Sequence, residues 1–443
     1  MTQPRIWNGP FTKALVLENP HASLDDYLAE QGIAVERLSE PPTTEDELIE
    51  ILAAGGHNLI YKRSRVQITE RVVAATPNLH AVMLCCIGDD SVDKMACAKH
   101  GVLVTNDPIS NGRSVAELVL GEMICLGRRV FDAYDETRSH KWHKNNQRRY
   151  ELRGKTLGVV GLGNIGKQVA QLGDALGMRI LFYDNREVAQ EVGETLGWEL
   201  AGDINAVFAR SHVLSLHLSA TDGRGRSNAG LIQRENLLSF GSDTDRPGPR
   251  IFINAARGFM FAPEDLREAV QSGAIEYACV DVFPQEPHHR GEDWQNPYAD
   301  VPGIITTPHI GAATQEAQPR IARHVASTTR LFNTRGRLRN CVYSPKHPIG
   351  VQAAENASHV LAIMHSDVRG TKRAIDEAIY DAGISNLSSA HRDFPKYGVA
   401  YDVSALDGGL SPDQLDGLVQ RAAEVTQDPT AIRSLRLIEL QGR

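Results

Sequence analysis

Residues 156–184, TLGVVGLGNIGKQVAQLGDALGMRILFYD, decide the fold of this chain. The apolar run LGVV has the length of a buried strand, and it leads directly into the glycine motif GLGNIG. Apolar residues at helical spacing follow, and a second apolar run, ILFY, ends at Asp184. The stretch therefore predicts a strand, a tight turn, a helix and a second strand that is closed by an acid.

Each glycine of the motif has its own structural role. Gly161 permits the sharp turn, Gly163 allows the backbone to approach a pyrophosphate, and Gly166 lets the helix pack closely on the strand. The helix N-terminus offers N–H groups to the phosphates, and Asp184 can accept hydrogen bonds from the adenine ribose. The motif alone also occurs in flexible loops, but the flanking strands and acid favour a dinucleotide site. The acid disfavours a 2′-phosphate, so we expect NAD, with Arg186 as an opposing influence.

Length and composition narrow the class of protein. The 443 residues suffice for two or three domains, and the formal net charge of −8 argues against a general nucleic-acid binder. No apolar run reaches membrane-spanning length, and the N-terminus MTQPRIWNGP lacks the apolar core of a signal peptide. The six cysteines have no C-x-x-C spacing, so we expect reduced thiols in a cytoplasmic protein.

Short apolar runs alternate with helical patterns along residues 1–110 and again along 156–307. This alternation predicts two parallel sheets covered by helices, and the second has the six strands of a doubly wound dinucleotide domain. The predicted strands are Ala14–Leu17, Val35–Leu38, Leu59–Tyr61, Ala81–Cys85 and Val102–Thr105, then Leu157–Val160, Ile180–Tyr183, Val213–His217, Ile251–Asn254, Tyr277–Val282 and Ile304–Thr307.

The last part of the chain has a different pattern. A helix at Gln315–Thr334 and a linker at Cys341–Gln352, with Pro345 and Pro348, precede it. The order β-α-β-β-α-β then predicts a ferredoxin-like unit. Its elements are Val360–Met364, Lys372–Ala382, Ile384–Ser388, Val399–Val403, Pro412–Val425 and Ile432–Leu440.

Two further local patterns are informative. Ser114 with Glu117 three residues later has the spacing of a capping box and predicts the start of a helix that runs to about Arg128. Residues 240–250 are a polar surface loop with no evident chemistry.

Three residues suited to hydride transfer follow consecutive predicted strands. Arg257, Glu286 and His309 emerge at the carboxyl edge, where ligands of such sheets bind. His309 is the natural base, Glu286 can hold its imidazole, and Arg257 can donate to a carboxylate or a developing carbonyl oxygen. Each alone is equally well an ordinary loop or surface residue, but the three together favour a dehydrogenase site.

A basic turn follows the third predicted strand. Lys62, Arg63 and Arg65 surround Ser64, a combination that suits a phosphate or carboxylate. A solvated basic turn explains this segment equally well.

Several motifs resemble the NAD-dependent D-isomer 2-hydroxyacid dehydrogenases. They are GLGNIG at 161–166, INAARG at 253–258, DVFPQEP at 281–287 and TPHIGAATQEA at 307–317. Other motifs are similar to the D-3-phosphoglycerate dehydrogenase branch, namely RSR at 63–65, CIGDDSVD at 86–93 and NGRSVAELV at 111–119. The C-terminal unit resembles the ACT regulatory domain.

The resemblance implies an α/β architecture with a doubly wound Rossmann nucleotide domain at 111–311. This domain would be inserted in a flavodoxin-like substrate domain formed by 1–110 and 312–345, and a ferredoxin-like ACT-like domain would occupy 353–443. The implied assembly is a homotetramer, with Trp142 and Lys144 near a subunit contact.

The resemblance also implies site residues, with Arg257, Glu286 and His309 as the catalytic set and no metal. The implied cofactor contacts are Gly161, Gly163, Asn164, Ile165, Gly166, Asp184, Ala255, Ala256, Asp281, Ile310, Gly311 and Ala312. The implied substrate contacts are Arg63, Ser64, Cys86, Ile87, Gly88 and Asn111.

The implied reaction is oxidation of 3-phospho-D-glycerate to 3-phosphooxypyruvate with NAD, the first step of L-serine biosynthesis. Another 2-hydroxy acid, such as 2-hydroxyglutarate or 4-phosphoerythronate, is an alternative substrate, and a non-catalytic NAD-sensing scaffold is an alternative of another class. No nucleic-acid or membrane partner is expected. Asp367 replaces the asparagine of serine-sensitive relatives, so we expect L-serine to inhibit weakly or not at all.

Overall fold

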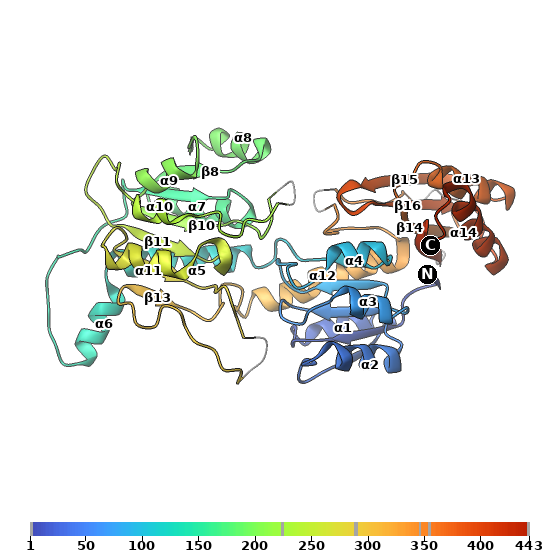
Figure 1. Ribbon diagram of the computed structural model, residues 1–443, viewed down its shortest axis with the longest axis horizontal. Coiled ribbons are helices and arrows are strands. Elements are labelled where there is room, and N and C mark those ends of the chain that lie inside the picture. The colour runs from blue at the N-terminus through green and yellow to red at the C-terminus, as the bar shows by residue number, and fades with distance from the viewer. Residues whose placement is uncertain (1–2, 223–225, 288–290, 345–346, 353–355, 441–443) are drawn as a thin grey trace. The chain divides into compact units, whose positions relative to one another are not determined.

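The computed structural model describes residues 3–222, 226–287, 291–344, 347–352 and 356–440. It divides into two compact units, of which unit 1 comprises Met1–Pro108 with Gln318–Arg443 and unit 2 comprises Ile109–Ala317 (Figure 1). Pro345 of the predicted linker lies outside the described residues. No helix in the described part of the chain is both long and apolar enough to cross a membrane.

The first sheet of unit 1 is parallel, in the order β3-β2-β4-β5-β6. This is the strand order of flavodoxin-like folds, and all five predicted strands are confirmed. The strands are β2 (Lys13–Val16), β3 (Ala34–Arg37), β4 (Leu59–Lys62), β5 (Ala81–Leu84) and β6 (Leu103–Thr105). The helices are α1 (Ser23–Ala29), α2 (Glu45–Gly55), α3 (Glu70–Ala75) and α4 (Lys94–Lys99).

The second sheet of unit 1 has the order β1-β17-β14-β16-β15. Its last four strands are antiparallel and have the ferredoxin-like connectivity that the sequence predicts. The strands are β1 (Arg5–Asn8), β14 (His359–Ser366), β15 (Asn386–Phe394), β16 (Val399–Leu406) and β17 (Ile432–Glu439). The helices are α13 (Thr371–Asp381), the short η2 (Pro395–Tyr397) and α14 (Pro412–Thr426).

Strand β1 was not predicted. It pairs in parallel with β17, at the other end of the chain. One of its side chains also contacts the helices that flank the first sheet. The buried guanidinium of Arg5 donates to the backbone oxygens of Val73, Thr76, Leu79 and His100. These bonds satisfy carbonyls near the ends of α3 and α4, so the N-terminus connects the two sheets of unit 1. The separation of 353–443 as an independent domain stays a prediction.

Unit 2 holds a parallel sheet in the order β13-β12-β11-β10-β7-β8-β9. The six predicted strands are confirmed, and the two-residue β9 is an addition at the edge. The strands are β7 (Thr156–Val160), β8 (Arg179–Tyr183), β9 (Glu199–Leu200), β10 (Val213–Leu216), β11 (Ile251–Asn254), β12 (Tyr277–Val280) and β13 (Ile304–Thr306).

Helices cover both faces of this sheet, so alternate residues of a strand enter two different cores. In β11, Ile251 and Ile253 pack into one core and Phe252 into the other. The helices are α5 (Gly112–Gly127), α6 (Val130–Arg138), α7 (Asn164–Ala175), α8 (Glu187–Thr195), α9 (Ile204–Arg210), α10 (Arg234–Leu238), η1 (Gly258–Met260) and α11 (Pro263–Gln271). Helix α12 (Ala317–Arg335) comes next in the chain, and all of it after Ala317 belongs to unit 1.

The predicted capping box at Ser114 is wrong. Helix α5 already begins at Gly112, with Asn111 at its N-cap, so Ser114 lies inside the first turn. Its hydroxyl is 2.9 Å from that of Thr314, and Glu117 instead pairs with Arg113. The serine therefore joins two segments of unit 2, and it does not cap its own helix.

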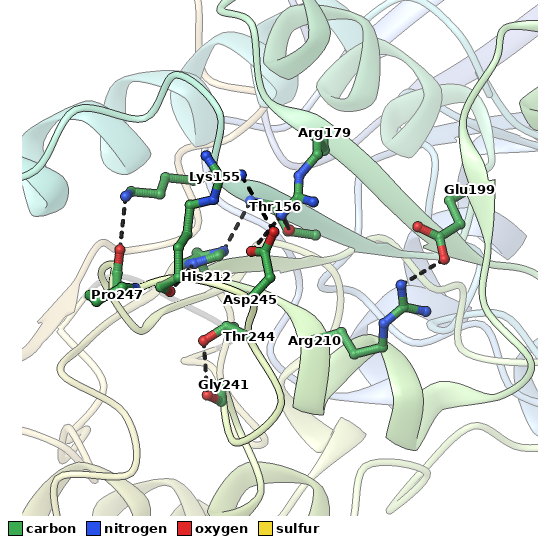
Figure 2. A network of polar contacts seen from close by, with 11 residues as sticks. Lys155, Thr156, Arg179, Glu199, Arg210, His212, Gly241, Thr244, Asp245 and Pro247 are labelled. Atoms are coloured by element: carbon green, nitrogen blue, oxygen red, sulfur yellow. Dashed lines mark hydrogen bonds and ion pairs between the residues drawn. The ribbon is translucent and has the colours of Figure 1, made fainter.

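The polar loop at 241–250 lies at the amino edge of this sheet, where β7, β8 and β10 begin (Figure 2). His212 accepts the backbone N–H of Thr156 at Nδ1 (3.0 Å), and its Nε2 donates to the backbone oxygen of Arg246 (2.9 Å). Arg179 pairs with Asp245 at 2.8 Å. The loop therefore closes the edge of the sheet that is opposite to the glycine motif.

Candidate active site

The glycine motif lies at the carboxyl edge of the sheet, between β7 and α7. Gly161 has φ 95°, and a Cβ there would lie 2.6 Å from the backbone oxygen of His217. A Cβ on Gly166 would lie 2.0 Å from the backbone oxygen of Gly161. A Cβ on Gly163 would have its nearest neighbour, the Arg186 guanidinium, 3.9 Å away. The missing side chain of Gly163 therefore leaves open space at the helix N-terminus. Two glycines are thus required by the backbone, and the third leaves room for a phosphate.

Asp184 ends β8 beside this turn, and its carboxylate is already engaged. One oxygen accepts the backbone N–H of Leu162 (2.9 Å), and the Arg186 guanidinium donates a hydrogen bond to each of the two oxygens (2.6 and 2.8 Å). Burial opposes ionisation, but the hydrogen bonds and charge of Arg186 hold the pKa of Asp184 below its ordinary value. A ribose that binds this carboxylate must therefore compete with Arg186.

Asp281 organises the turn that follows β13. It accepts hydrogen bonds from the hydroxyl of Thr307 (2.6 Å) and from the backbone N–H groups of Ile310 (2.8 Å) and Gly311 (2.9 Å). The structure thus places the predicted cofactor contacts Asp281, Ile310 and Gly311 in one network. Thr307 was not singled out in the sequence, although its position at a strand end was a usable signal.

His309 lies in this turn and meets Glu286. Its Nδ1 is 2.7 Å from Oε2 of Glu286, whose other oxygen accepts the backbone N–H of Phe283 (3.1 Å). The backbone of His309 has φ 55°, which is uncommon for a residue other than glycine. The His309 side chain is 44% exposed, and its Nε2 makes no hydrogen bond with a described residue.

The electrostatics of this pair favour a histidine that takes up a proton. Burial alone would lower the pKa of His309, but the hydrogen bond to Glu286 and the negative charge of Glu286 raise it above its ordinary value. Burial opposes ionisation of Glu286, yet its contact with His309 keeps the pKa of that carboxyl below its ordinary value. The pair therefore holds an imidazolium once a proton has been accepted.

Arg257 is placed near this pair by close backbone packing. A Cβ on Gly258 would lie 1.9 Å from the backbone carbon of Phe283, so only glycine fits there. Asn254 fixes the turn before it, since its side chain accepts from Ala256 N (3.1 Å) and donates to the backbone oxygen of Arg257 (3.0 Å). The positive charge of Arg257 lowers the pKa of both Glu286 and His309. The three predicted catalytic residues thus act on one another electrostatically.

The basic turn after β4 in unit 1 differs in part from the prediction. Lys62 is not available to an external anion, because its side chain is buried and donates to Ser91 Oγ (2.6 Å) and the backbone oxygen of Arg63 (2.7 Å). Burial lowers the pKa of Lys62, and Glu18 opposes that effect with its charge. Glu18 also accepts the backbone N–H groups of Arg65 and Val66. The sequence around the turn gave no sign of this inward lysine.

The remaining predicted substrate contacts are placed as follows. Arg63 is half-buried and Ser64 exposed on this turn. After β5, the Cys86 thiol donates to the backbone oxygen of Gly88 (3.2 Å), and the backbone oxygen of Ile87 accepts from Asn106. In unit 2, Asn111 is buried at the N-cap of α5.

The carboxyl edge of unit 2 can therefore bind a dinucleotide and transfer a proton. The glycine turn and helix α7 suit a pyrophosphate, and the His309–Glu286 pair suits a hydroxyl group that becomes a carbonyl. Within the described residues of this edge there is no cluster of metal ligands.

Known proteins resemble this chain in sequence and in fold. A model of the D-isomer specific 2-hydroxyacid dehydrogenase NAD binding domain matches residues 120–311. The D-3-phosphoglycerate dehydrogenase of Dictyostelium discoideum is 33% identical over 84% of this chain and 87% of its own length. D-3-phosphoglycerate dehydrogenase 2 of Saccharomyces cerevisiae is 32% identical over 93% of this chain and 86% of its own.

Among solved structures, the TT0316 protein from Thermus thermophilus has a TM-score of 0.61 and 26% identity. The match covers 76% of this chain and 99% of that protein. Sequence and fold thus agree with the resemblance that the motifs indicated.

Proposed function

The chain belongs to the D-3-phosphoglycerate dehydrogenase family, and on this premise we propose that it oxidises 3-phospho-D-glycerate to 3-phosphooxypyruvate with NAD, the first step of L-serine biosynthesis. The observation that carries the proposal is the 2.7 Å contact of His309 with Glu286, on the same sheet edge as the dinucleotide turn. The open space at Gly163 and the acid at Asp184 fit NAD.

In the proposed reaction His309 removes the proton from the hydroxyl on C2 of the substrate. It uses Nε2, because Nδ1 is held by Glu286. Bound NAD supplies the acceptor for the hydride that leaves the same carbon. Glu286 stabilises the imidazolium that forms, and Arg257 places a fixed positive charge where the substrate carboxylate and the new carbonyl oxygen need it. In the reverse direction His309 returns the proton.

Substrate binding is part of the same proposal. We assign the phosphate to Arg63 and Ser64, and further contacts to Asn111 and the backbone of residues 86–88. Arg63 offers a planar donor for charge-assisted hydrogen bonds, and its guanidinium makes no hydrogen bond or ion pair with a described residue in this structure.

The direct test is a panel of 2-hydroxy acids assayed by NADH absorbance. We expect 3-phosphoglycerate to give the highest kcat/KM, above 2-hydroxyglutarate and 4-phosphoerythronate. Arg63→Ala should raise KM for 3-phosphoglycerate far more than for unphosphorylated glycerate, with Arg65→Ala as the matched control. Absence of turnover with every acid, despite NADH binding, would instead favour a non-catalytic NAD-sensing scaffold.

We also propose a cytoplasmic homotetramer. Trp142 supports this assembly, because its side chain is 84% exposed and so large an apolar surface is typical of a subunit contact. The C-terminal unit would act as an ACT-like assembly domain with little response to L-serine, since Asp367 and Arg369 are both exposed. Light scattering on wild type and Trp142→Ala tests the assembly, and a serine titration of the assay tests the response.

A further inference from the structure

The ferredoxin-like sheet carries a group of side chains that the proposed function does not use. His365 on β14, His391 on β15 and Asp402 on β16 each offer one metal-ligating atom, and these atoms lie within 4.8 Å of one another. We call this set the His365 cluster. In the sheet register Asp402 lies opposite both His391 and Ile363. His365 is two residues from Ile363, so all three ligands are on the sheet face that packs against α13 and α14.

The hydrogen bonds of the two imidazoles show which ring nitrogen of each can face an ion. Nδ1 of His365 is 2.8 Å from the backbone oxygen of Ser366, which only accepts, so Nδ1 carries the proton and Nε2 a lone pair. That Nε2 is buried and has no hydrogen-bond partner among the described residues, and His365 is 2% exposed.

His391 differs in that each of its ring nitrogens faces a carboxylate, so Nδ1 donates to Asp402 when no ion is bound and gives up that proton to bind one. Its Nε2 is 2.7 Å from the Asp393 carboxylate, and its Nδ1 is 3.1 Å from Oδ2 of Asp402. Histidines that bind metals typically donate the other ring N–H to a carbonyl or a carboxylate. Ser366 and Asp393 fill those two positions.

The cluster already compensates a buried negative charge with a cation. Asp402 is 1% exposed, and Nζ of Lys372 lies 3.2 Å from its Oδ2. Lys372 has a second partner on the same helix, Asp376, at 2.6 Å. An incoming cation can therefore replace the ammonium at Asp402 without leaving Lys372 unpaired.

The distances suit a small divalent ion. A tetrahedral ion with bonds of about 2.0–2.2 Å holds its ligand atoms roughly 3.4 Å apart. The 3.1 Å separation between His391 and Asp402 is close to that value, and all three ligand atoms lie within 4.8 Å of one another. Two imidazoles and one carboxylate are a ligand set that suits Zn²⁺, and a water molecule completes the four positions.

We propose that His365, His391 and Asp402 bind a divalent transition-metal ion, with Zn²⁺ as the best match, and that the ion links β14, β15 and β16. The site is independent of the dehydrogenase activity, because it uses no residue of the proposed active site.

The test uses the full chain, stripped with a chelator and titrated with Zn²⁺ in a calorimeter. Wild type should bind one more equivalent of Zn²⁺ than His391→Ala, and Asp402→Asn should weaken that equivalent at least tenfold. The matched control is His359→Ala. It removes a histidine outside the cluster from β14, the strand that carries His365, and should bind Zn²⁺ like wild type. Lys372→Ala should bind more tightly, because the competing ammonium is gone.

Equal Zn²⁺ stoichiometry and affinity in wild type and His391→Ala would overturn the proposal. His391 lies on an edge strand, and circular dichroism checks that its variant folds. Should it unfold, Co²⁺ added to wild type decides: intense visible bands of four-coordinate Co²⁺ are expected, and their absence also overturns the proposal.

Discussion

The two edges of the seven-stranded sheet carry similar side chains and use them in opposite ways. At the amino edge, both ring nitrogens of His212 bond to backbone groups, and Arg179 pairs with Asp245 (Figure 2). At the carboxyl edge, His309 uses one nitrogen for Glu286, and the other makes no hydrogen bond with a described residue. A histidine satisfied on both sides supports the fold, whereas one satisfied on a single side is available for chemistry.

The largest effect is expected from the carboxyl-edge histidine. His309→Asn should lower kcat with 3-phosphoglycerate by roughly 10²–10⁴, because the proton acceptor is lost. NADH binding, followed by its fluorescence, should change little, since the glycine turn is intact. Full turnover by this variant would refute the role of His309.

Cofactor choice is the next largest effect. Asp184→Ala should weaken the binding of NAD about 10- to 100-fold, because charge-assisted hydrogen bonds to the ribose are lost. It should also raise activity with NADP. The guanidinium of Arg186, released from its carboxylate, becomes available to a 2′-phosphate. The control is Asp245→Ala, which breaks an acid–arginine pair at the amino edge. This variant should leave the ratio of NAD to NADP activity unchanged. A wild type that prefers NADPH would contradict this view of Asp184.

The amino edge should respond in stability and not in rate. His212→Asn removes one buried and one partly buried hydrogen bond of the imidazole. It should lower the free energy of unfolding by about 1–3 kcal/mol, with kcat unchanged. Burial lowers the pKa of His212 in the fold, so its neutral form stabilises above the unfolded pKa near 6.5 and this contribution is lost as pH falls. Urea unfolding at pH 8 and pH 5.5 should show a smaller deficit for the variant at the lower pH.

A buried acid of helix α5 gives a further test. Burial raises the pKa of Glu122 on α5 to about 7. The fold therefore favours its protonated form, and stability falls as pH rises from about 4.5 to 7. When the pH is raised from 5 to 8, the free energy of unfolding of Glu122→Gln should rise by about 1–3 kcal/mol relative to that of wild type. Glu117→Gln, an exposed acid on the same helix, is the control, and an equal gain there would mean that burial of Glu122 is not the cause.

Much of the fold could be predicted because apolar runs mark buried parallel strands. Once the strands were known, topology placed Arg257, Glu286 and His309 at one edge, since parallel strands end on the same side of a sheet. The roles of these three residues remain a proposal.

Features that depend on distant partners could not be predicted. Strand β1 has only four residues and pairs with a strand at the other end of the chain. The Lys62 side chain points inward because of its contacts with Ser91 and Glu18, which lie in other segments. Ser114 has the right local pattern for a cap, but the backbone at Asn111 starts the helix earlier.

The role of the His309–Glu286 pair can be measured through the pH dependence of kcat/KM for 3-phosphoglycerate oxidation, in wild type and Glu286→Gln. His309 must be unprotonated to act as a base, so the rate should rise with pH through its pKa. Glu286 raises that pKa, and its neutral replacement should move the acidic limb to lower pH. An acidic limb at the same pH in both proteins would show that another group is the base.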